Sequence, residues 1–221
     1  MTNSPARSNA ADTVRVDAGP IRRVCVYCGS GKGLNPLFKA AAQTLGRDLA
    51  AADIELVYGG GSLGLMGETA RAVLENGGRV TGIIPEFLSD REKMLEDVQE
   101  LIVTQDMHER KRLMFERSDA IVALPGGIGT LEELVEQLTW SQLGQHVKPI
   151  CLADIDGFWK PLLDLLEHMR GETFIREGLE VDFLVAKTAE KIVPTLLDAA
   201  NALPVHPDQR VIEREEIGAK L

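Results

Sequence analysis

Short apolar runs alternate with longer amphipathic runs along most of this chain, and the two kinds of run have different periods. The apolar runs predict β-strands at Arg22–Cys28, Ile54–Tyr58, Arg79–Ile84, Val98–Val103, Ala120–Leu124 and Pro149–Ala153. Runs with helical periodicity predict helices at Pro36–Ala51, Leu65–Asn76, Asp106–Arg117, Leu131–Leu143, Phe158–Met169 and Thr188–Ala200. Regular alternation of this kind indicates parallel strands joined by crossover helices. We therefore predict a single-domain α/β fold, a Rossmann-like open parallel sheet with helices on both faces.

The two ends of the chain depart from this pattern. Residues 1–20 are rich in Ser, Asn, Ala and Asp with little periodicity, which predicts a disordered N-terminal extension. Residues 204–221 are charged and contain proline, which predicts a polar C-terminal tail. The folded domain is thus expected at residues 21–203. With 44% of the 221 residues hydrophobic, the chain can bury one sizeable core.

Composition narrows the possible functions. A net charge of −10 and a pI near 5.0 argue against binding to nucleic acid or to an anionic membrane. No apolar run approaches a membrane span and the first residues do not resemble a secretory signal, so we expect a cytoplasmic protein. The cysteines and histidines are scattered, so neither a disulfide framework nor a metal site is expected. Cys25 and Cys28 would face opposite sides of one strand, and we interpret them as buried structural residues.

Three glycine-rich turns follow predicted strands, at Cys28–Gly33, Gly59–Gly67 and Pro125–Glu133. In an open α/β sheet, ligands bind at the carboxyl ends of the strands. A glycine-rich turn before a helix directs backbone N–H groups and the helix dipole at one spot, which suits a phosphate. Glu133 lies just past the third turn, where its carboxylate would repel a phosphate. If this turn binds a nucleotide, Glu133 must serve another part of it.

These motifs have other interpretations as well. Gly59–Gly64 fits the dinucleotide pattern G-x-G-x-x-G with Glu86 downstream, but the first strand–helix turn of the chain does not carry it, which disfavours a dinucleotide cofactor. Gly31-Lys32 lacks the other residues of a P-loop. Thr130 and Glu133 also have the spacing of a capping box, so a capping role and a catalytic role are both open for Glu133.

The charged segment that begins at Asp106 and the Thr139-Trp140 pair have structural explanations as well. The former could be an ordinary charged helix face, and the latter could pack in the core. Their meaning depends on the motifs around them.

Four motifs occur together in a fixed order: Cys28-Gly29-Ser30, Gly59-Gly60-Gly61-Ser62-x-Gly64-Leu65-Met66-Gly67, Asp106-Met107-His108-x-Arg110-Lys111 and Pro125-Gly126-Gly127-x-Gly129-Thr130-x-x-Glu133. In this combination the chain closely resembles the LOG ("Lonely Guy") family of cytokinin riboside 5′-monophosphate phosphoribohydrolases, whose members were often labelled lysine decarboxylases. The resemblance spans Val24 to Val193.

The resemblance implies hydrolysis of the N-glycosidic bond of a purine nucleoside 5′-monophosphate, without cofactor or metal, by a homodimer. The implied catalytic residues are Arg110 and Glu133. The implied substrate contacts are Glu92, Arg110, Lys111, Gly127, Ile128, Gly129, Thr130, Leu131, Glu132, Glu133 and Thr139. The segment Ser89–Gln105 is more charged than is usual in plant members, which leaves Glu92 and the base specificity less well defined.

The implied chemistry agrees with the residue types. N-glycoside cleavage passes through an oxocarbenium-like state, which a nearby carboxylate stabilises. Glu133 could face the ribose and act on water, while the N–H groups of Gly127, Gly129 and Thr130 hold the 5′-phosphate. Arg110 could clamp Glu133 or a ribose hydroxyl.

Three alternatives stay open. The chain could be a non-catalytic purine-nucleotide-binding or sensor module, or an enzyme that acts on AMP or other plain purine monophosphates. A decarboxylase would need a pyridoxal phosphate lysine, and nothing around Lys111 or Lys148 distinguishes one.

Overall fold

The computed structural model describes residues 21–176 and 178–202, and for residues 90–92 it describes the backbone alone. The predicted extension at residues 1–20 and the predicted tail at residues 204–221 lie outside the described part of the chain.

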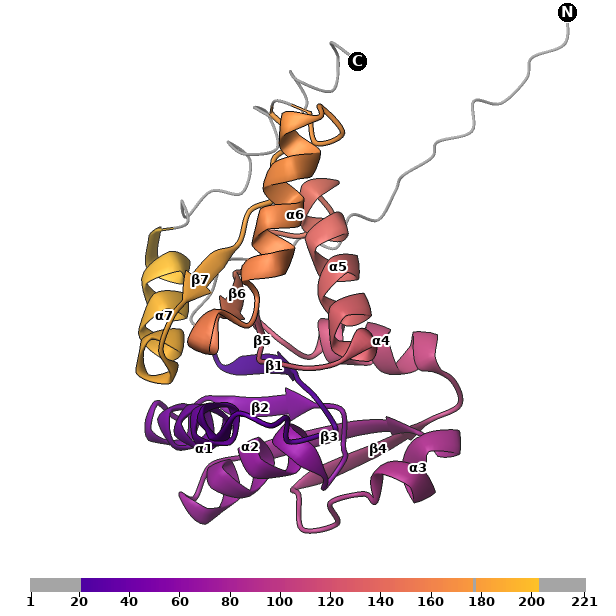
Figure 1. The fold of residues 1–221 in the computed structure, drawn as a ribbon. Helices are drawn as coiled ribbons and strands as arrows, with labels where there is room; N and C mark the ends of the chain where they lie inside the picture. The colour runs from indigo at the N-terminus through magenta and orange to yellow at the C-terminus, as the bar shows by residue number, and fades with distance from the viewer. Residues whose placement is uncertain (1–20, 177, 203–221) are drawn as a thin grey trace, which may run out of the picture.

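Within the described part, seven parallel strands form one sheet in the order β4-β3-β2-β1-β5-β6-β7 (Figure 1). The strands are β1 (Arg23–Tyr27), β2 (Glu55–Tyr58), β3 (Val80–Pro85), β4 (Glu100–Thr104), β5 (Ala120–Ala123), β6 (Ile150–Ala153) and β7 (Leu184–Ala186). Strand order reverses at β1, which pairs with β2 on one side and with β5 on the other. Such a reversal opens a crevice at the carboxyl ends of the strands, where ligands bind.

Helices cover both faces of the sheet, which confirms the predicted fold class (Figure 1). One face carries α1 (Pro36–Ala51), α2 (Gly64–Glu75) and α7 (Ile192–Ala202). The other carries α4 (Met107–Glu116), α5 (Ile128–Gln142) and α6 (Lys160–Gly171). The short helix α3 (Glu86–Glu92) follows β3 directly, and single 3-10 turns lie at Ile155–Gly157 and Ala189–Lys191. None of the described helices is long and apolar enough to cross a membrane.

Each face of the sheet contributes to its own apolar layer, because successive residues of a strand point to opposite sides. Val24 and Val26 of β1 pack in the layer under α1 and α2, whereas Cys25 and Tyr27 pack in the layer under α4 and α5. Cys28 belongs to the layer opposite Cys25, and both cysteines are buried. The interpretation of these two cysteines as structural residues is confirmed.

The structure differs from the predicted elements at a few places. The strand β7 and the helix α3 were not predicted, since three residues at a sheet edge and seven residues after Pro85 are too short to show a clear period. The helix α5 begins at Ile128 rather than at Leu131. Its first turn contains Gly129, and glycine is more typical of loops than of helices, so the sequence pattern placed the helix start too late.

The three glycine-rich turns meet at the carboxyl edge of the sheet. The Gly29 N–H donates to the Pro125 carbonyl at 3.1 Å, and the Leu65 N–H donates to the Gly29 carbonyl at 2.9 Å. A Cβ atom at Gly29 would lie 3.2 Å from the Gly126 Cα. The first turn is therefore held between the second and the third turns.

Candidate active site

Arg110 lies in a narrow seat at the carboxyl edge of the sheet. It projects from α4 and is buried, and its Nε donates to the Ile83 carbonyl at the end of β3 at 3.2 Å. A Cβ atom at Gly59 would lie only 2.3 Å from its Nη2. The second glycine turn thus leaves room for the guanidinium, and the Ile83 carbonyl fixes its orientation.

Glu133 faces this guanidinium from α5. Arg110 Nη1 lies 3.3 Å from Glu133 Oε1, and the side chain of each residue is only 9% exposed. An ion pair that is this well buried constrains both partners, because loss of either one would leave an uncompensated charge in a low dielectric. The predicted pairing of Arg110 with Glu133 is therefore present in the structure.

The capping role considered for Glu133 is wrong. The N-cap of α5 is Gly127, and no side chain caps this helix. Thr130 is the third residue of the helix rather than its cap, and it is buried close to Gly126, where an added Cβ would lie 2.1 Å from Thr130 Oγ1. Because Glu133 is one turn further along, it points to Arg110 and not back to the helix start.

The first turn of α5 is open to a ligand. A Cβ atom at Gly127 or at Gly129 would meet nothing within 4 Å, and neither residue has a positive φ. Packing and backbone conformation therefore do not require glycine at these two positions. The first N–H groups of a helix have no intrahelical partner, and here no side chain caps them, so an anion could approach them closely.

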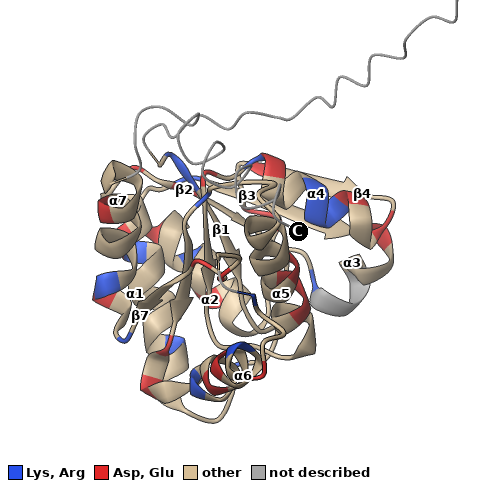
Figure 2. Cartoon of the chain, turned by 90° about the horizontal axis from the view of Figure 1, so that it is seen from above, with Lys and Arg blue, Asp and Glu red and all other residues tan. Residues whose placement is uncertain are grey.

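Lys111 ties α4 to α5. Its Nζ donates to Glu132 Oε1 at 2.6 Å and to Glu136 Oε1 at 2.9 Å. Burial lowers the pKa of Lys111, but the two hydrogen-bonded carboxylates outweigh this effect and hold the pKa above its ordinary value. Figure 2 shows the basic run of α4 and the acidic residues of α5 on neighbouring helices. Lys111 is thus a permanent cation held between two helices.

The other predicted contact residues are placed differently. Ile128 is exposed and Leu131 is half-buried near the start of α5. Thr139 is exposed six residues beyond Glu133, and its Oγ1 donates to the Val135 carbonyl at 2.7 Å. One chain therefore does not bring Thr139 to the Arg110–Glu133 pair.

The side chain of Glu92 is outside the described part of the structure, but its backbone ends α3 beside the second glycine turn. The next residue, Lys93, accepts a hydrogen bond from the Ser62 N–H at 2.8 Å through its carbonyl. Leu95 N–H donates to the Gly60 carbonyl at 3.1 Å. The segment after Glu92 is thus fixed against the Gly59–Gly67 turn.

Sequence reasoning missed three residues of this site. Glu136 could have been found, because it follows Glu132 by one helical turn and can bind the same lysine. The Ile83 carbonyl carries no sequence signal. Gly59 lies in a glycine-rich motif, but the motif does not show that this residue makes room for Arg110, because that contact depends on how α4 approaches the sheet.

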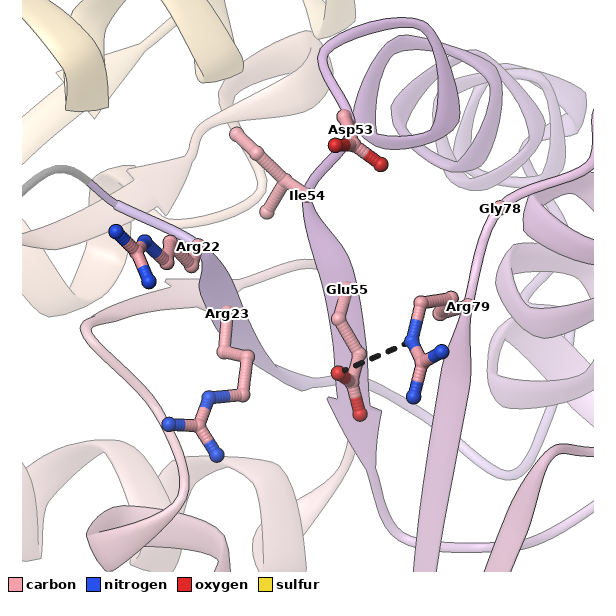
Figure 3. Close-up of a pocket in the computed structure, with 7 residues that line it drawn as sticks. All are labelled: Arg22, Arg23, Asp53, Ile54, Glu55, Gly78 and Arg79. Carbon is pink, nitrogen blue, oxygen red and sulfur yellow. Dashed lines mark ion pairs between the residues drawn. The ribbon is translucent and has the colours of Figure 1, made fainter.

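A cavity of about 540 Å³ lies at the opposite, amino-terminal edge of the sheet, and Figure 3 shows its lining. Its residues are Arg22, Arg23, Asp53, Ile54, Glu55, Gly78 and Arg79, with Arg79 Nε 3.7 Å from Glu55 Oε2. It contains none of the predicted site residues and mixes both signs of charge. Among the described residues there is also no cluster of His, Cys, Asp or Glu that could hold a metal ion.

Comparisons with known proteins identify the family of this chain. Residues 66–196 match the model of a family described as "Possible lysine decarboxylase". The chain is 46% identical over 186 residues to probable cytokinin riboside 5′-monophosphate phosphoribohydrolase LOGL1 of Oryza sativa subsp. japonica, covering 84% of this chain and 83% of the relative. It is also 46% identical over 179 residues to cytokinin riboside 5′-monophosphate phosphoribohydrolase LOG3 of Arabidopsis thaliana, covering 81% of this chain and 83% of that protein.

Among solved structures, the molybdenum cofactor (Moco) carrier protein of Chlamydomonas reinhardtii shares the fold, with a TM-score of 0.61 and 23% identity over 82% of this chain and 98% of that one. The family model and the two sequence relatives go further than the fold. They show that this chain is a member of the LOG family.

Proposed function

We propose that this protein hydrolyses the N-glycosidic bond of cytokinin riboside 5′-monophosphates, and of AMP, releasing the free base and ribose 5-phosphate. The single observation that carries the proposal is the buried Arg110–Glu133 pair beside the open, uncapped start of α5. The start of α5 suits an anion, and the carboxylate of Glu133 suits a sugar that carries positive charge. The two relatives are named as enzymes of this class.

The proposed reaction begins when the bond between ribose C1′ and the base nitrogen breaks. The electron pair leaves with the base, and positive charge develops on the ribose ring. Glu133 stabilises this charge and takes a proton from the water that attacks C1′. That proton then goes to the departing base, so the overall reaction consumes one water. Arg110 keeps Glu133 ionised and oriented.

The phosphate end of the substrate is proposed to bind at the first turn of α5. The backbone N–H groups of Gly127, Ile128, Gly129 and Thr130 and the dipole of α5 suit a 5′-phosphate. We also propose that Glu92, Lys111, Leu131, Glu132 and Thr139 contact the substrate, as in the family. Lys111 would contact the substrate while it stays paired with Glu132 and Glu136, because both carboxylates already bind its ammonium group.

The homodimer stays a prediction, and one face of α5 supports it. Ile128 is 83% exposed and Val135 is 43% exposed on this face, which also carries Thr139. A partner seated there would bring its own Thr139 close to the first turn of the facing helix. The cytoplasmic location expected from the sequence also stays a prediction.

The family description as a lysine decarboxylase finds no support in the two lysines considered. Lys111 is bound by two carboxylates. Lys148 donates through Nζ to the Phe115 carbonyl at 2.5 Å and lies 3.6 Å from the centre of the Phe115 ring. It precedes β6, at the end of the strands opposite to the glycine turns. A Schiff base at either lysine would break these contacts.

A substrate comparison tests the proposal. The protein is incubated with isopentenyladenosine monophosphate, AMP, GMP and CMP, and the free bases are quantified by chromatography. We expect release of purine bases only, and no release by Glu133→Gln. Tight binding of AMP without release would establish the non-catalytic alternative instead, and normal turnover by Glu133→Gln would remove Glu133 from the mechanism.

A further inference from the structure

A glutamine with no visible partner lies under the Arg110–Glu133 pair. Gln137 follows Glu133 by one turn of α5, so the two side chains project from the same face of the helix. Gln137 has no exposed surface, and neither its Nε2 nor its Oε1 has a hydrogen-bond partner among the described residues. A buried amide without hydrogen-bond partners destabilises the folded state, because its desolvation is not compensated. Something must therefore pair with this side chain.

Tyr27 provides an independent observation at the same place. It ends β1, it is 1% exposed, and no described nitrogen or oxygen pairs with its hydroxyl, although the Cys25 thiol, a weak partner, lies beside it. Burial raises the pKa of Tyr27 well above its ordinary value, and the neighbouring Cys25 and the charges of Glu133 and Glu136 act in the same direction. The hydroxyl therefore lies within the electrostatic reach of the carboxylates on α5.

Packing places these groups in one layer. Tyr27 belongs to the same apolar cluster as Leu134 and Leu138, the α5 residues on either side of Gln137 along that face. Glu136 adds a further unpaired atom, because Lys111 binds its Oε1 while its Oε2 is buried without a partner in the described chain. A strand and a helix that pack in the same layer thus both carry buried polar atoms without a partner in the described chain.

We propose that Tyr27 and Gln137 bind a buried water molecule that they share with the carboxylates of Glu133 and Glu136. Water matches this set because it can donate two hydrogen bonds and accept two, and buried waters usually make about three. The hydroxyl and the amide N–H donate to the water, and the water donates to the carboxylates. Tyr27 and Gln137 are then positioning residues that act on Glu133 through the water.

This inference rests on the proposed function for its kinetic part only. The variants Tyr27→Phe and Gln137→Leu each remove the polar group and keep most of the side-chain volume. If the water positions Glu133, each variant should lower kcat about three- to ten-fold, the effect of one lost hydrogen bond, and leave KM unchanged. Tyr58→Phe is the matched control. Tyr58 is also buried with an unpaired hydroxyl, but it packs on the other face of the sheet.

A purely structural role predicts a different result. Replacing an unpaired buried amide with leucine would then raise the melting temperature and leave kcat unchanged. That outcome, or an equal loss of kcat in Tyr58→Phe, would overturn the positioning role.

A crystal structure of the wild-type protein at high resolution tests the water itself, whatever the enzyme does. We expect a density peak about 2.7–3.2 Å from Tyr27 Oη and from a Gln137 amide atom, and its loss in Gln137→Leu. A dry interior, or direct pairing of the side chains, would overturn the water site. If no substrate releases a base, the proposed function fails while the water site still stands or falls on this structure.

Discussion

The guanidinium of Arg110 fits in its position only because Gly59 has no Cβ atom. The guanidinium occupies the place that a Cβ atom would need, and the Ile83 carbonyl and Glu133 hold it from two other directions. Because all three constraints act on one planar group, a small shift of any of them misaligns the ion pair. At the scale of single residues, catalytic geometry is therefore set by close contact as much as by charge.

Gly59→Ala tests this seat. The new methyl would lie 2.3 Å from Arg110 Nη2, so the guanidinium must move away from Glu133. We expect kcat to fall at least about ten-fold, since a small misplacement of catalytic groups is enough for such a loss. Gly171→Ala, at the end of α6 with nothing within 4 Å of the added atom, should retain full activity. Equal activity of the two variants would show that Arg110 tolerates displacement.

The helix α5 combines several duties in its first three turns. Its uncapped start is open, its second turn carries Glu133, and the next turn carries the buried Gln137. Successive turns of a helix are about 5.4 Å apart along its axis. The first turn of α5 can therefore face the phosphate of a ligand while the second turn faces its sugar.

Gly129→Ala separates binding from folding at this element. The added methyl meets no protein atom, and alanine is the better helix former by about 1 kcal/mol, so the melting temperature should not fall. The same methyl would stand between the backbone N–H groups and a phosphate. We expect KM for the monophosphate to rise at least about ten-fold, and inhibition by inorganic phosphate to weaken. An unchanged KM would place the phosphate elsewhere.

Lys148 anchors the end of α4 through the Phe115 carbonyl and ring. Burial lowers the pKa of Lys148 to about 8, from an ordinary value of 10.5. Between these two pH values the unfolded chain binds more protons than the folded one, so the contribution of Lys148 to stability rises with pH. Below about pH 8 both states hold the proton, and the cost of the buried charge is present in full.

Urea unfolding between pH 7.5 and pH 10 measures this effect. The free energy of unfolding of Lys148→Met should rise less steeply with pH than that of the wild type over this range. Parallel pH profiles would mean that the Phe115 carbonyl and ring stabilise the ammonium enough to cancel its burial.

Predictability differed between elements for physical reasons. Long strands and helices buried on a full face, such as β1 and α1, have periods that the sequence displays directly. The start of α5 was misplaced because Gly127 and Gly129 have loop-like composition, although their backbone serves a helix. At the site, the resemblance to the LOG family indicated Arg110 and Glu133 together. The contact of Arg110 with Ile83 could not be predicted, because it arises from the packing of α4 on β3.

At the scale of the whole molecule, the exposed apolar face of α5 predicts self-association. Val135→Glu should convert the predicted dimer to a monomer and reduce activity, because a charge would be buried in the predicted interface. Leu165→Glu is the control, since Leu165 is 46% exposed on α6, a helix with no buried residues. Light scattering after size-exclusion chromatography measures both. A wild-type monomer with full activity would contradict the predicted dimer.

The hydrogen bonds of Gly29 to the two neighbouring turns also limit how this enzyme can be redesigned. The backbone of one residue, Gly29, joins the turn that seats Arg110, through Leu65, to the turn that precedes Glu133, through Pro125. An insertion in the Cys28–Gly33 loop would therefore move the two catalytic side chains apart, even though it touches neither. Libraries that aim at a new base should keep this loop at its present length and vary the segment after α3, which in the described part of the chain is hydrogen-bonded to the second turn and not to the first or the third.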